Sequence, residues 1–145
     1  DHHPQQPKAD ADLFVVRPEI GVSATILIEW LKAGDIEIPA DLATALAFAI
    51  SSETQNLGRE ATKRDIDSYL HVYVKSSIRK LAQITYPKLP RSYFSTLAKA
   101  LKKTYIYKNL ICSHLGDVPN AEIVAEMADF LLRHERVGWS LCSGR

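Results

Sequence analysis

Two apolar segments with clear start and stop signals constrain the chain most, because each is typical of a buried helix. The segment "SATILIEWLKAG" begins at Ser23, a residue type that favours helix N-caps, and ends at Gly34, a residue type that often follows a helix. It is apolar on most faces, which predicts a buried helix over residues 23–33. In "PADLATALAFAISS", Pro39 stands in the first turn, where helices tolerate proline, so we predict a second, mostly buried helix to residue 52.

Three further helices follow along the chain. Thr62 is suited to cap a third helix, whose apolar positions recur at helical spacing as far as Ile84. The prolines of "TYPKLPRS" should end it, since each disfavours the helical conformation of the preceding residue. We expect another amphipathic helix over residues 93–103, and a last one in "VPNAEIVAEMADFLLRHE" with Asn120 as its N-cap.

Short segments rich in β-branched and aromatic residues alternate with these helices. We predict strands in "LFVV" at residues 13–16, in "YIYKNLICSHLG" at residues 105–116, and in "VGWSLCSGR" at the end of the sequence. The alternation predicts an α/β fold that is rich in helix, with a parallel-sheet core. Because the sequence lacks a first Met and its last strand is cut short, we expect an internal piece of a longer protein.

Composition excludes several classes of protein. With 145 residues, 46% of them hydrophobic and 24% charged, the chain is typical of a globular domain that buries a core. Its longest apolar stretches are shorter than the roughly 20 residues that cross a membrane, and no secretion signal is present, so we expect a cytoplasmic protein without a membrane partner. Cys112 and Cys142 lie far apart and outside any metal-binding spacing, which favours free, buried thiols. No sequence pattern decides the oligomeric state.

Charge is strongly segregated along the chain. Residues 68–116 contain no Asp or Glu but nine Lys and Arg, so they carry +9, whereas the remaining nine basic and 17 acidic residues carry −8. All six tyrosines lie in the same segment. Basic side chains interleaved with aromatic rings are typical of surfaces that bind single-stranded nucleic acid. Two plainer interpretations stay open: a solvated basic face, and tyrosines that pack in the core.

The opening "DHHP" is weak evidence by itself, since histidine pairs at a terminus are common. Together with "GVSAT" before a helix and "ETQNLGRE" after the next one, it resembles the DHH family of phosphoesterases. That family includes single-strand exonucleases, oligoribonucleases, cyclic-dinucleotide phosphodiesterases, exopolyphosphatases and inorganic pyrophosphatases. The resemblance implies the later half of a DHH domain over residues 1–115, followed by a connector helix and the start of a DHHA1-like domain over residues 116–145.

The resemblance also implies roles for the opening residues. Phosphoester hydrolysis needs charge compensation, an activated water and in-line attack, and two divalent ions supply all three. Carboxylates with neutral imidazoles suit Mn²⁺, and oxygen ligands alone suit Mg²⁺. Family membership would make His2 a metal ligand and His3 the catalytic group that faces the substrate phosphate. Asp1 would accept a hydrogen bond from an imidazole and orient it.

A later motif departs from the family pattern. The family has Asp-Thr where this chain has Glu53 and Thr54, so Glu53 would be a metal ligand with a longer arm and Thr54 a supporting hydrogen-bond partner. The plainer alternative is that Glu53 is an ordinary solvated acid of the loop. Arg59 is a candidate for binding the substrate phosphate, since a guanidinium offers paired donors, or a surface arginine paired with Glu60. Ser23 and Thr25 open a helix and can bind an anion or simply cap it.

Two family motifs, His-x-x-Pro-Asp-x-Asp and an isolated Asp after a strand, are absent from these residues. We therefore expect these 145 residues alone to be catalytically inert and the whole protein to be a hydrolase. The favoured substrates are single-stranded RNA or DNA and short oligonucleotides. Pyrophosphate, polyphosphate and cyclic dinucleotides are alternatives, and so is a non-catalytic module that binds a nucleotide or nucleic acid.

Overall fold

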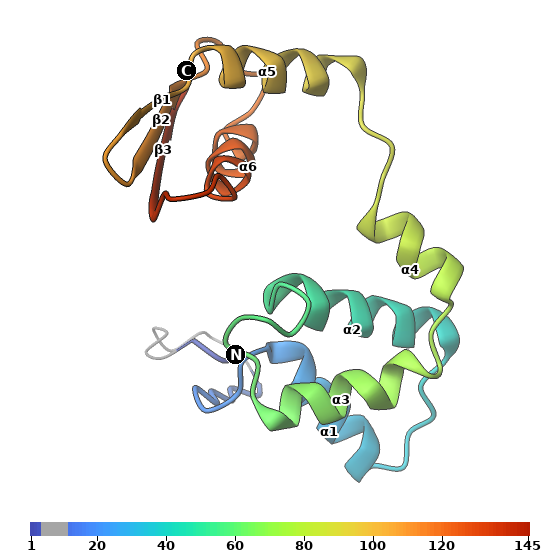
Figure 1. The fold of residues 1–145 in the computed structure, drawn as a ribbon. Helices are drawn as coiled ribbons and strands as arrows, with labels where there is room; N and C mark the ends of the chain where they lie inside the picture. The colour runs from blue at the N-terminus through green and yellow to red at the C-terminus, as the bar shows by residue number, and fades with distance from the viewer. Residues whose placement is uncertain (4–11) are drawn as a thin grey trace. The chain divides into compact units, whose positions relative to one another are not determined.

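A computed structural model describes residues 1–3 and 12–145 of the chain, which form two compact units, Asp1–Pro87 and Lys88–Arg145 (Figure 1). The boundary at residues 115/116 that the sequence predicts falls inside the second unit, after a strand. The assignment of residues 116–145 to a DHHA1-like domain stays a prediction.

The described part of the first unit is built from helices α1 (Ser23–Ala33), α2 (Ala40–Glu53), α3 (Lys63–Tyr73) and α4 (Ile78–Thr85). Helix α2 packs against each of the other three (Figure 1), which places its Ala- and Leu-rich sequence in the core. The fully buried residues of this core are Ile28, Ala43, Ala47, Ile50 and Val72. The two apolar helices predicted from the sequence are confirmed, and α1 ends at Gly34 as predicted.

The predicted continuous helix from Thr62 to Ile84 is wrong, because the chain breaks between α3 and α4 at residues 74–77. The backbone N–H of Ser77 donates to Thr44 Oγ1 of α2 at 2.8 Å instead of continuing the helix. The hydroxyl of Ser77 then accepts from Lys80 N–H and caps α4. A buried hydroxyl on a neighbouring helix therefore stabilises the break.

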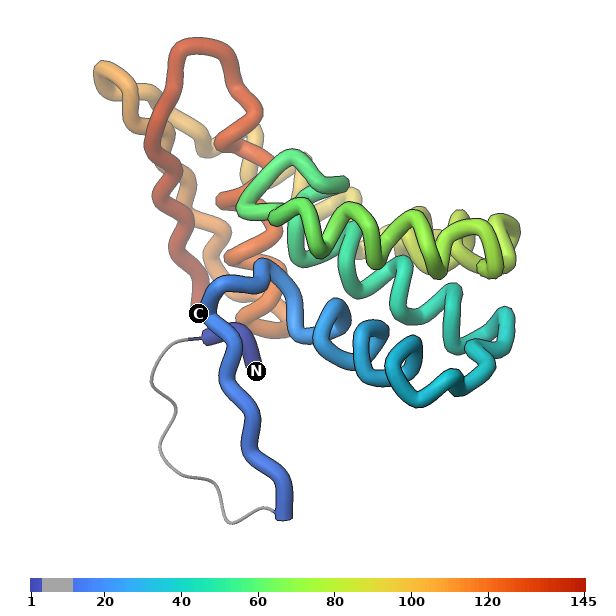
Figure 2. The backbone as a smooth tube through the Cα atoms, turned by 90° about the horizontal axis from the view of Figure 1, so that it is seen from below, coloured from blue at the N-terminus to red at the C-terminus, as the bar shows by residue number. Residues whose placement is uncertain are grey.

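Residues 13–16 do not form the predicted strand, although they are extended. Asp1 N–H donates to the carbonyl of Val15 at 2.7 Å, and Arg17 N–H donates to the carbonyl of Asp1 at 2.8 Å. These two bonds have the pattern of a parallel strand pair centred on Asp1 and Val16. Figure 2 shows residues 1–3 beside this extended stretch. One paired residue is too little to define a strand, but it is enough to place Asp1 and His2 beside the start of α1.

The second unit contains α5 (Arg91–Lys102), β1 (Tyr105–Tyr107), β2 (Leu110–His114), α6 (Glu122–Leu131) and β3 (Trp139–Ser143). The single strand predicted over residues 105–116 is wrong, because Lys108 adopts a positive φ of 56° and the chain turns into a hairpin. The sheet order is β1-β2-β3, with β1 and β2 antiparallel and β2 and β3 parallel. The α/β class is therefore confirmed, and the parallel-sheet core that the sequence suggested is a small mixed sheet in which β2 and β3 are parallel.

Helices cover one face of this sheet. Ala100, Ile123 and Met127 of α5 and α6 are buried together, and Cys142 of β3 packs against them. Cys112 and Cys142 are free, as predicted, with Cys112 buried and Cys142 half-buried. Burial raises the pKa of the Cys142 thiol above its ordinary value, which disfavours the reactive thiolate form.

The strands carry exposed apolar and aromatic side chains as well. Tyr107 is paired in register with Leu110, and Leu110 with Trp139, so these residues lie in one row across the sheet. Tyr107 and Trp139 are both exposed, and the Lys108 ammonium lies 5.5 Å from the centre of the Tyr107 ring. The second unit thus presents aromatic rings next to a positive charge. Among the residues that the structure describes, no helix is long and apolar enough to cross a membrane.

Candidate functional site

His2 lies between two side chains that reach it from different helices. Its Nδ1 is 2.9 Å from the hydroxyl of Ser23, at the first residue of α1. Its Nε2 is 3.8 Å from Glu53 Oε1, at the last residue of α2. The ring is mostly buried, with 17% of its side chain exposed. Since Ser23 occupies Nδ1, the nitrogen that faces Glu53 is the one left for another ligand.

Asp1 and His3 form a second pair beside this ring. Asp1 Oδ1 is 2.9 Å from His3 Nδ1 and also accepts the backbone N–H of His3 at 3.1 Å. Asp1 Oδ1 is farther from His2 Nδ1, at 3.8 Å. The rings of His2 and His3 lie 4.0 Å apart between centroids. Asp1 therefore orients His3 directly, whereas Ser23 orients His2.

The sequence after Glu53 explains why its carboxylate is available. Thr54 ends α2, and its hydroxyl donates to the carbonyl of Ile50 at 2.6 Å and accepts Leu57 N–H at 2.9 Å. Residues 55–57 all have positive φ, between 48° and 65°, which is unusual for residues other than glycine. This left-handed turn carries the chain away from the helix end, so Glu53 is left half-exposed beside His2. Thr54 supports the turn, and within the described part of the chain its side chain forms no hydrogen bond with His2 or Glu53.

The negative charge of Glu53 is unfavourable at its position at the C-terminal end of α2. The C-terminal end of a helix carries partial negative charge, so an acidic side chain there is unfavourable by about 0.3–1 kcal/mol. The last turn of α2 contains no basic residue. The side chain beside the Glu53 carboxylate is His2, and an imidazole is a group that can bind a cation or carry a positive charge. An acid at this position is easier to explain by a positive ligand than by stability of the helix.

Arg59 does not reach this group of side chains through any hydrogen bond or ion pair among the described residues. Its Nε is 3.5 Å from Glu60 Oε1, and both side chains are exposed. The pairing with Glu60 that the sequence left open is therefore observed. A role for Arg59 in binding phosphate stays a prediction.

Sequence reasoning missed Asp65, a fully buried carboxylate in the first turn of α3. It forms a capping box with Thr62, whose spacing to Asp65 is visible in the sequence. It also accepts the hydroxyl of Thr25 at 2.6 Å and the backbone N–H of Gly21 at 3.0 Å. Thr25 is thus a buried partner of Asp65, not an open anion-binding group, and Ser23 is a partner of His2.

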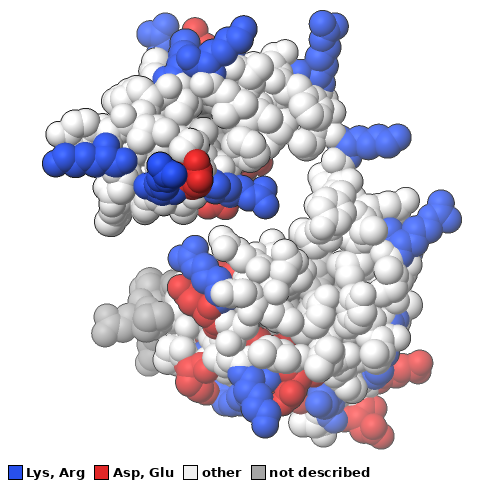
Figure 3. Space-filling view, viewed as in Figure 1, with Lys and Arg blue, Asp and Glu red and all other residues white. Residues whose placement is uncertain are grey.

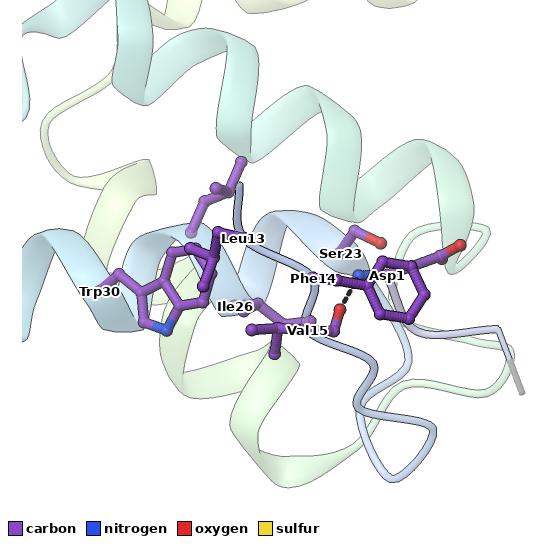
Figure 4. A pocket seen from close by; sticks show the side chains of 8 residues that line it. Asp1, Leu13, Phe14, Val15, Ser23, Ile26 and Trp30 are labelled. Carbon is purple, nitrogen blue, oxygen red and sulfur yellow. Dashed lines mark hydrogen bonds between the residues drawn. The ribbon is translucent and has the colours of Figure 1, made fainter. Parts of the chain in front are cut away.

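A shallow pocket of about 280 Å³ lies against α1 on the same side as Asp1 (Figure 4). Its lining is mostly apolar: Leu13, Phe14, Val15, Ile26, Leu27 and Trp30, with Asp1 and Ser23 at one end. Figure 4 shows the hydrogen bond from Asp1 to the Val15 carbonyl at this end. The polar residues around His2 therefore border an apolar depression.

The donor set around His2 suits a divalent cation. Asp1, His2 and His3 each offer a ligand atom, and these atoms lie within 4.8 Å of one another. His2 Nε2 and Glu53 Oε1, 3.8 Å apart, have the spacing of two ligands that share one ion, which is roughly 3–4 Å for bonds of about 2.1 Å. Imidazole and carboxylate groups are ligands that several divalent metal ions accept.

No protein-family model matches the chain. An uncharacterized protein of Methanocaldococcus jannaschii is 35% identical over 147 residues, which cover 99% of this chain and 30% of that protein. The chain thus spans under a third of the length of this relative.

The crystal structure of an exopolyphosphatase-related protein from Bacteroides fragilis has a similar fold, with a TM-score of 0.71. The match covers 94% of this chain and 44% of that one, at 15% sequence identity. At this level of identity the similarity concerns the fold alone.

Proposed function

We propose that the chain belongs to a metal-dependent phosphoesterase of the DHH type, with His2 and Glu53 as ligands of a divalent cation. The observation that carries the proposal is the placement of His2 between Ser23 Oγ and Glu53 Oε1. The similarity in fold to an exopolyphosphatase-related protein supports the reaction class. Hydrolysis by the whole protein is part of the proposal, because the chain spans only 30% of the length of its relative.

Each side chain has a separate task in this proposal. In the proposed tautomer, His2 Nδ1–H donates to Ser23 Oγ, which lies 2.9 Å away, and the Nε2 lone pair is left for the metal. Glu53 supplies a negative oxygen on the same side. A divalent ion bound there would withdraw charge from the phosphoryl oxygens and lower the pKa of a bound water. Mn²⁺ is the ion we propose, with Mg²⁺ as the alternative, and a second ion would need ligands beyond those described here.

His3 is suited to act on the substrate. Asp1 holds its Nδ1, and the side chain is 59% exposed, so the other ring nitrogen is accessible to a ligand. In its doubly protonated form the ring donates a hydrogen bond to a phosphoryl oxygen, which stabilises charge that builds up in the transition state. Arg59, exposed on the loop after Glu53, would add a second donor once it is released from Glu60.

Single-stranded nucleic acid is the substrate class that we propose. The second unit contains nine Lys and Arg against five Asp and Glu, and residues 88–116 contain no acid. On the face shown in Figure 3, blue side chains outnumber red ones over this unit. The exposed rings of Tyr107 and Trp139 offer surfaces on which bases can stack.

Polyphosphate is the second candidate, because the protein of similar fold is named exopolyphosphatase-related. A polyphosphate chain needs positive charge but no aromatic rings. The two candidate substrates therefore differ in whether the rings of Tyr107 and Trp139 contribute to binding.

The test compares hydrolysis of a short single-stranded RNA and of inorganic polyphosphate by the whole protein in the presence of Mn²⁺. Faster release of nucleotides than of orthophosphate would support the nucleic-acid substrate. The reverse ratio would move the proposal to polyphosphate. Binding of RNA without any hydrolysis would make the domain a binding module and overturn the proposed reaction.

A further inference from the structure

Asp65 makes more hydrogen bonds than a helix cap needs. Its side chain is 0% exposed, and within the described residues it accepts four hydrogen bonds. Oδ2 accepts the backbone N–H and hydroxyl of Thr62 at 2.8 and 2.6 Å, which complete the cap of α3. The other two come from Thr25 and Gly21, which lie at the start of α1. The carboxylate therefore joins two helices.

These contacts bring the backbone before α1 unusually close to the loop before α3. A Cβ atom added to Gly21 would lie 2.5 Å from the carbonyl oxygen of Glu60 and 2.8 Å from Asp65 Oδ2. Both distances are shorter than side chains tolerate, so residue 21 must be glycine for this approach. The position of the first turn of α1 is set by Asp65 through Gly21 on one side and Thr25 on the other.

Ser23 lies between these two anchors in the sequence. Its hydroxyl is the group that holds His2 Nδ1. A shift of the first turn of α1 relative to α3 would move Ser23 Oγ and turn the His2 ring with it. The nitrogen that faces Glu53 would then change its direction.

We infer that Asp65 is a positioning residue of the site: through Gly21 and Thr25 it fixes Ser23, and Ser23 fixes the His2 ring toward Glu53. This inference rests on the proposed function for its consequence, which is metal affinity. The orientation of His2 can be measured without any metal, so the two ideas can fail separately.

Two substitutions separate the geometry from the charge. In Asp65→Asn, the amide oxygen can accept from Gly21 and Thr62 while the amide nitrogen donates to Thr25, so the geometry is kept. In Asp65→Ala, the partly buried N–H of Gly21 and the buried hydroxyl of Thr25 lose their acceptor. Asp67→Ala is the matched control, since Asp67 is an exposed acid on the same helix.

The readouts are the ¹⁵N signals of the His2 ring in metal-free protein and the dissociation constant for Mn²⁺, both measured where circular dichroism shows each variant to be folded. We expect Asp65→Ala to move the His2 signals and to weaken Mn²⁺ binding by roughly 10–100-fold, the usual cost of losing a group that orients a metal ligand. Asp65→Asn should stay within about threefold of the unchanged protein, because it retains the geometry. Asp67→Ala should alter neither readout.

A folded Asp65→Ala protein with unchanged His2 signals and unchanged Mn²⁺ affinity would overturn the inference. If Asp65→Ala does not fold, Thr25→Val tests one half of the link, because it removes the bond from α1 and keeps the bond from Gly21. Unchanged His2 signals there would overturn the part of the inference that runs through Thr25. If the unchanged protein binds no Mn²⁺ but Asp65→Ala still moves the His2 signals, the proposed function fails and the positioning role stands.

Discussion

His2 Nε2 and Glu53 Oε1 lie 3.8 Å apart, although the two residues are far apart in the sequence and Glu53 is the last residue of α2. The hydrogen bond between His2 Nδ1 and Ser23 Oγ directs the ring toward Glu53. An acid at a helix C-terminus is unfavourable alone, and the proposed cation, held by Glu53 and His2, would offset its charge.

Replacing Ser23 tests how the ring is held. Ser23→Ala removes the partner of His2 Nδ1, so the ring can turn and its tautomer is no longer fixed. We expect Mn²⁺ affinity to fall about 10-fold or more, as isothermal titration calorimetry would measure. Ser23→Thr keeps the hydroxyl and should keep most of the affinity. Equal affinities for the alanine variant and the unchanged protein would contradict this role of Ser23.

Glu53→Gln should have opposite effects on stability and on metal binding. The neutral amide removes an unfavourable charge from the end of α2, so the free energy of unfolding of metal-free protein should rise by about 0.3–1 kcal/mol. Mn²⁺ affinity should fall, because a charged ligand is lost. Urea unfolding with and without Mn²⁺ measures both. A variant that is less stable without metal would show that Glu53 has a structural role instead.

Gly21→Ala should destabilise the first unit. The new methyl group would meet the backbone oxygen of Glu60 at 2.5 Å, and a backbone atom cannot move aside as a flexible side chain would. We expect a loss of about 1–3 kcal/mol, the usual cost of overpacking, in chemical denaturation. Gly58→Ala is the control, because its closest new contact would be 3.3 Å. Similar losses in both variants would mean that the close approach at Gly21 is not what matters.

Acid should remove the stabilisation that Asp65 provides. Burial alone would raise the pKa of this carboxyl, but the hydrogen bonds from Thr25, Thr62 and Gly21 outweigh burial and hold the pKa below its ordinary value of 3.8. A carboxyl with a lowered pKa stabilises the fold fully above its unfolded pKa and loses this contribution as the pH falls through the folded pKa. The stability advantage of the unchanged protein over Asp65→Asn should thus shrink below about pH 4. An advantage that stays constant down to pH 2 would contradict this assignment.

Trp139→Ala tests the proposed nucleic-acid surface of the second unit. Loss of a stacking ring should weaken binding of a short single-stranded RNA by about 1–3 kcal/mol in fluorescence anisotropy. Binding of polyphosphate should not change, because it has no bases. Tyr86→Ala, which removes an exposed ring from the first unit, is the control. If Trp139→Ala leaves RNA binding unchanged, this face of the sheet is not part of a nucleic-acid site.

Local signals in the sequence predicted most of the helices. Gly34 ends α1, Thr62 caps α3, and Asn120 Oδ1 accepts Ile123 N–H at the start of α6, all within a few residues of the pattern that indicates them. The break between α3 and α4 could not be predicted in this way, because its partner, Thr44, lies on another helix.

Contacts between segments distant in sequence also limit what could be predicted about the candidate site. The resemblance pointed to His2, His3 and Glu53, and the structure brings His2 and Glu53 together. The bond from Ser23 to His2 and the second role of Asp65 depend on contacts between segments distant in sequence, which no local pattern records. Residues 13–16 have the β-branched composition of a strand. A strand also needs a pairing partner, however, and the sequence of this segment does not show which residues pair with it.

The most direct test of the metal site is a Mn²⁺ titration of the whole protein and of its His2→Ala, Glu53→Ala and Glu53→Asp variants, followed by hydrolysis of a short single-stranded RNA at saturating Mn²⁺. The account predicts that His2→Ala and Glu53→Ala lose both tight Mn²⁺ binding and hydrolysis, and that Glu53→Asp retains them in part. Mn²⁺ binding and hydrolysis that survive both alanine substitutions would contradict the assignment of His2 and Glu53 as metal ligands.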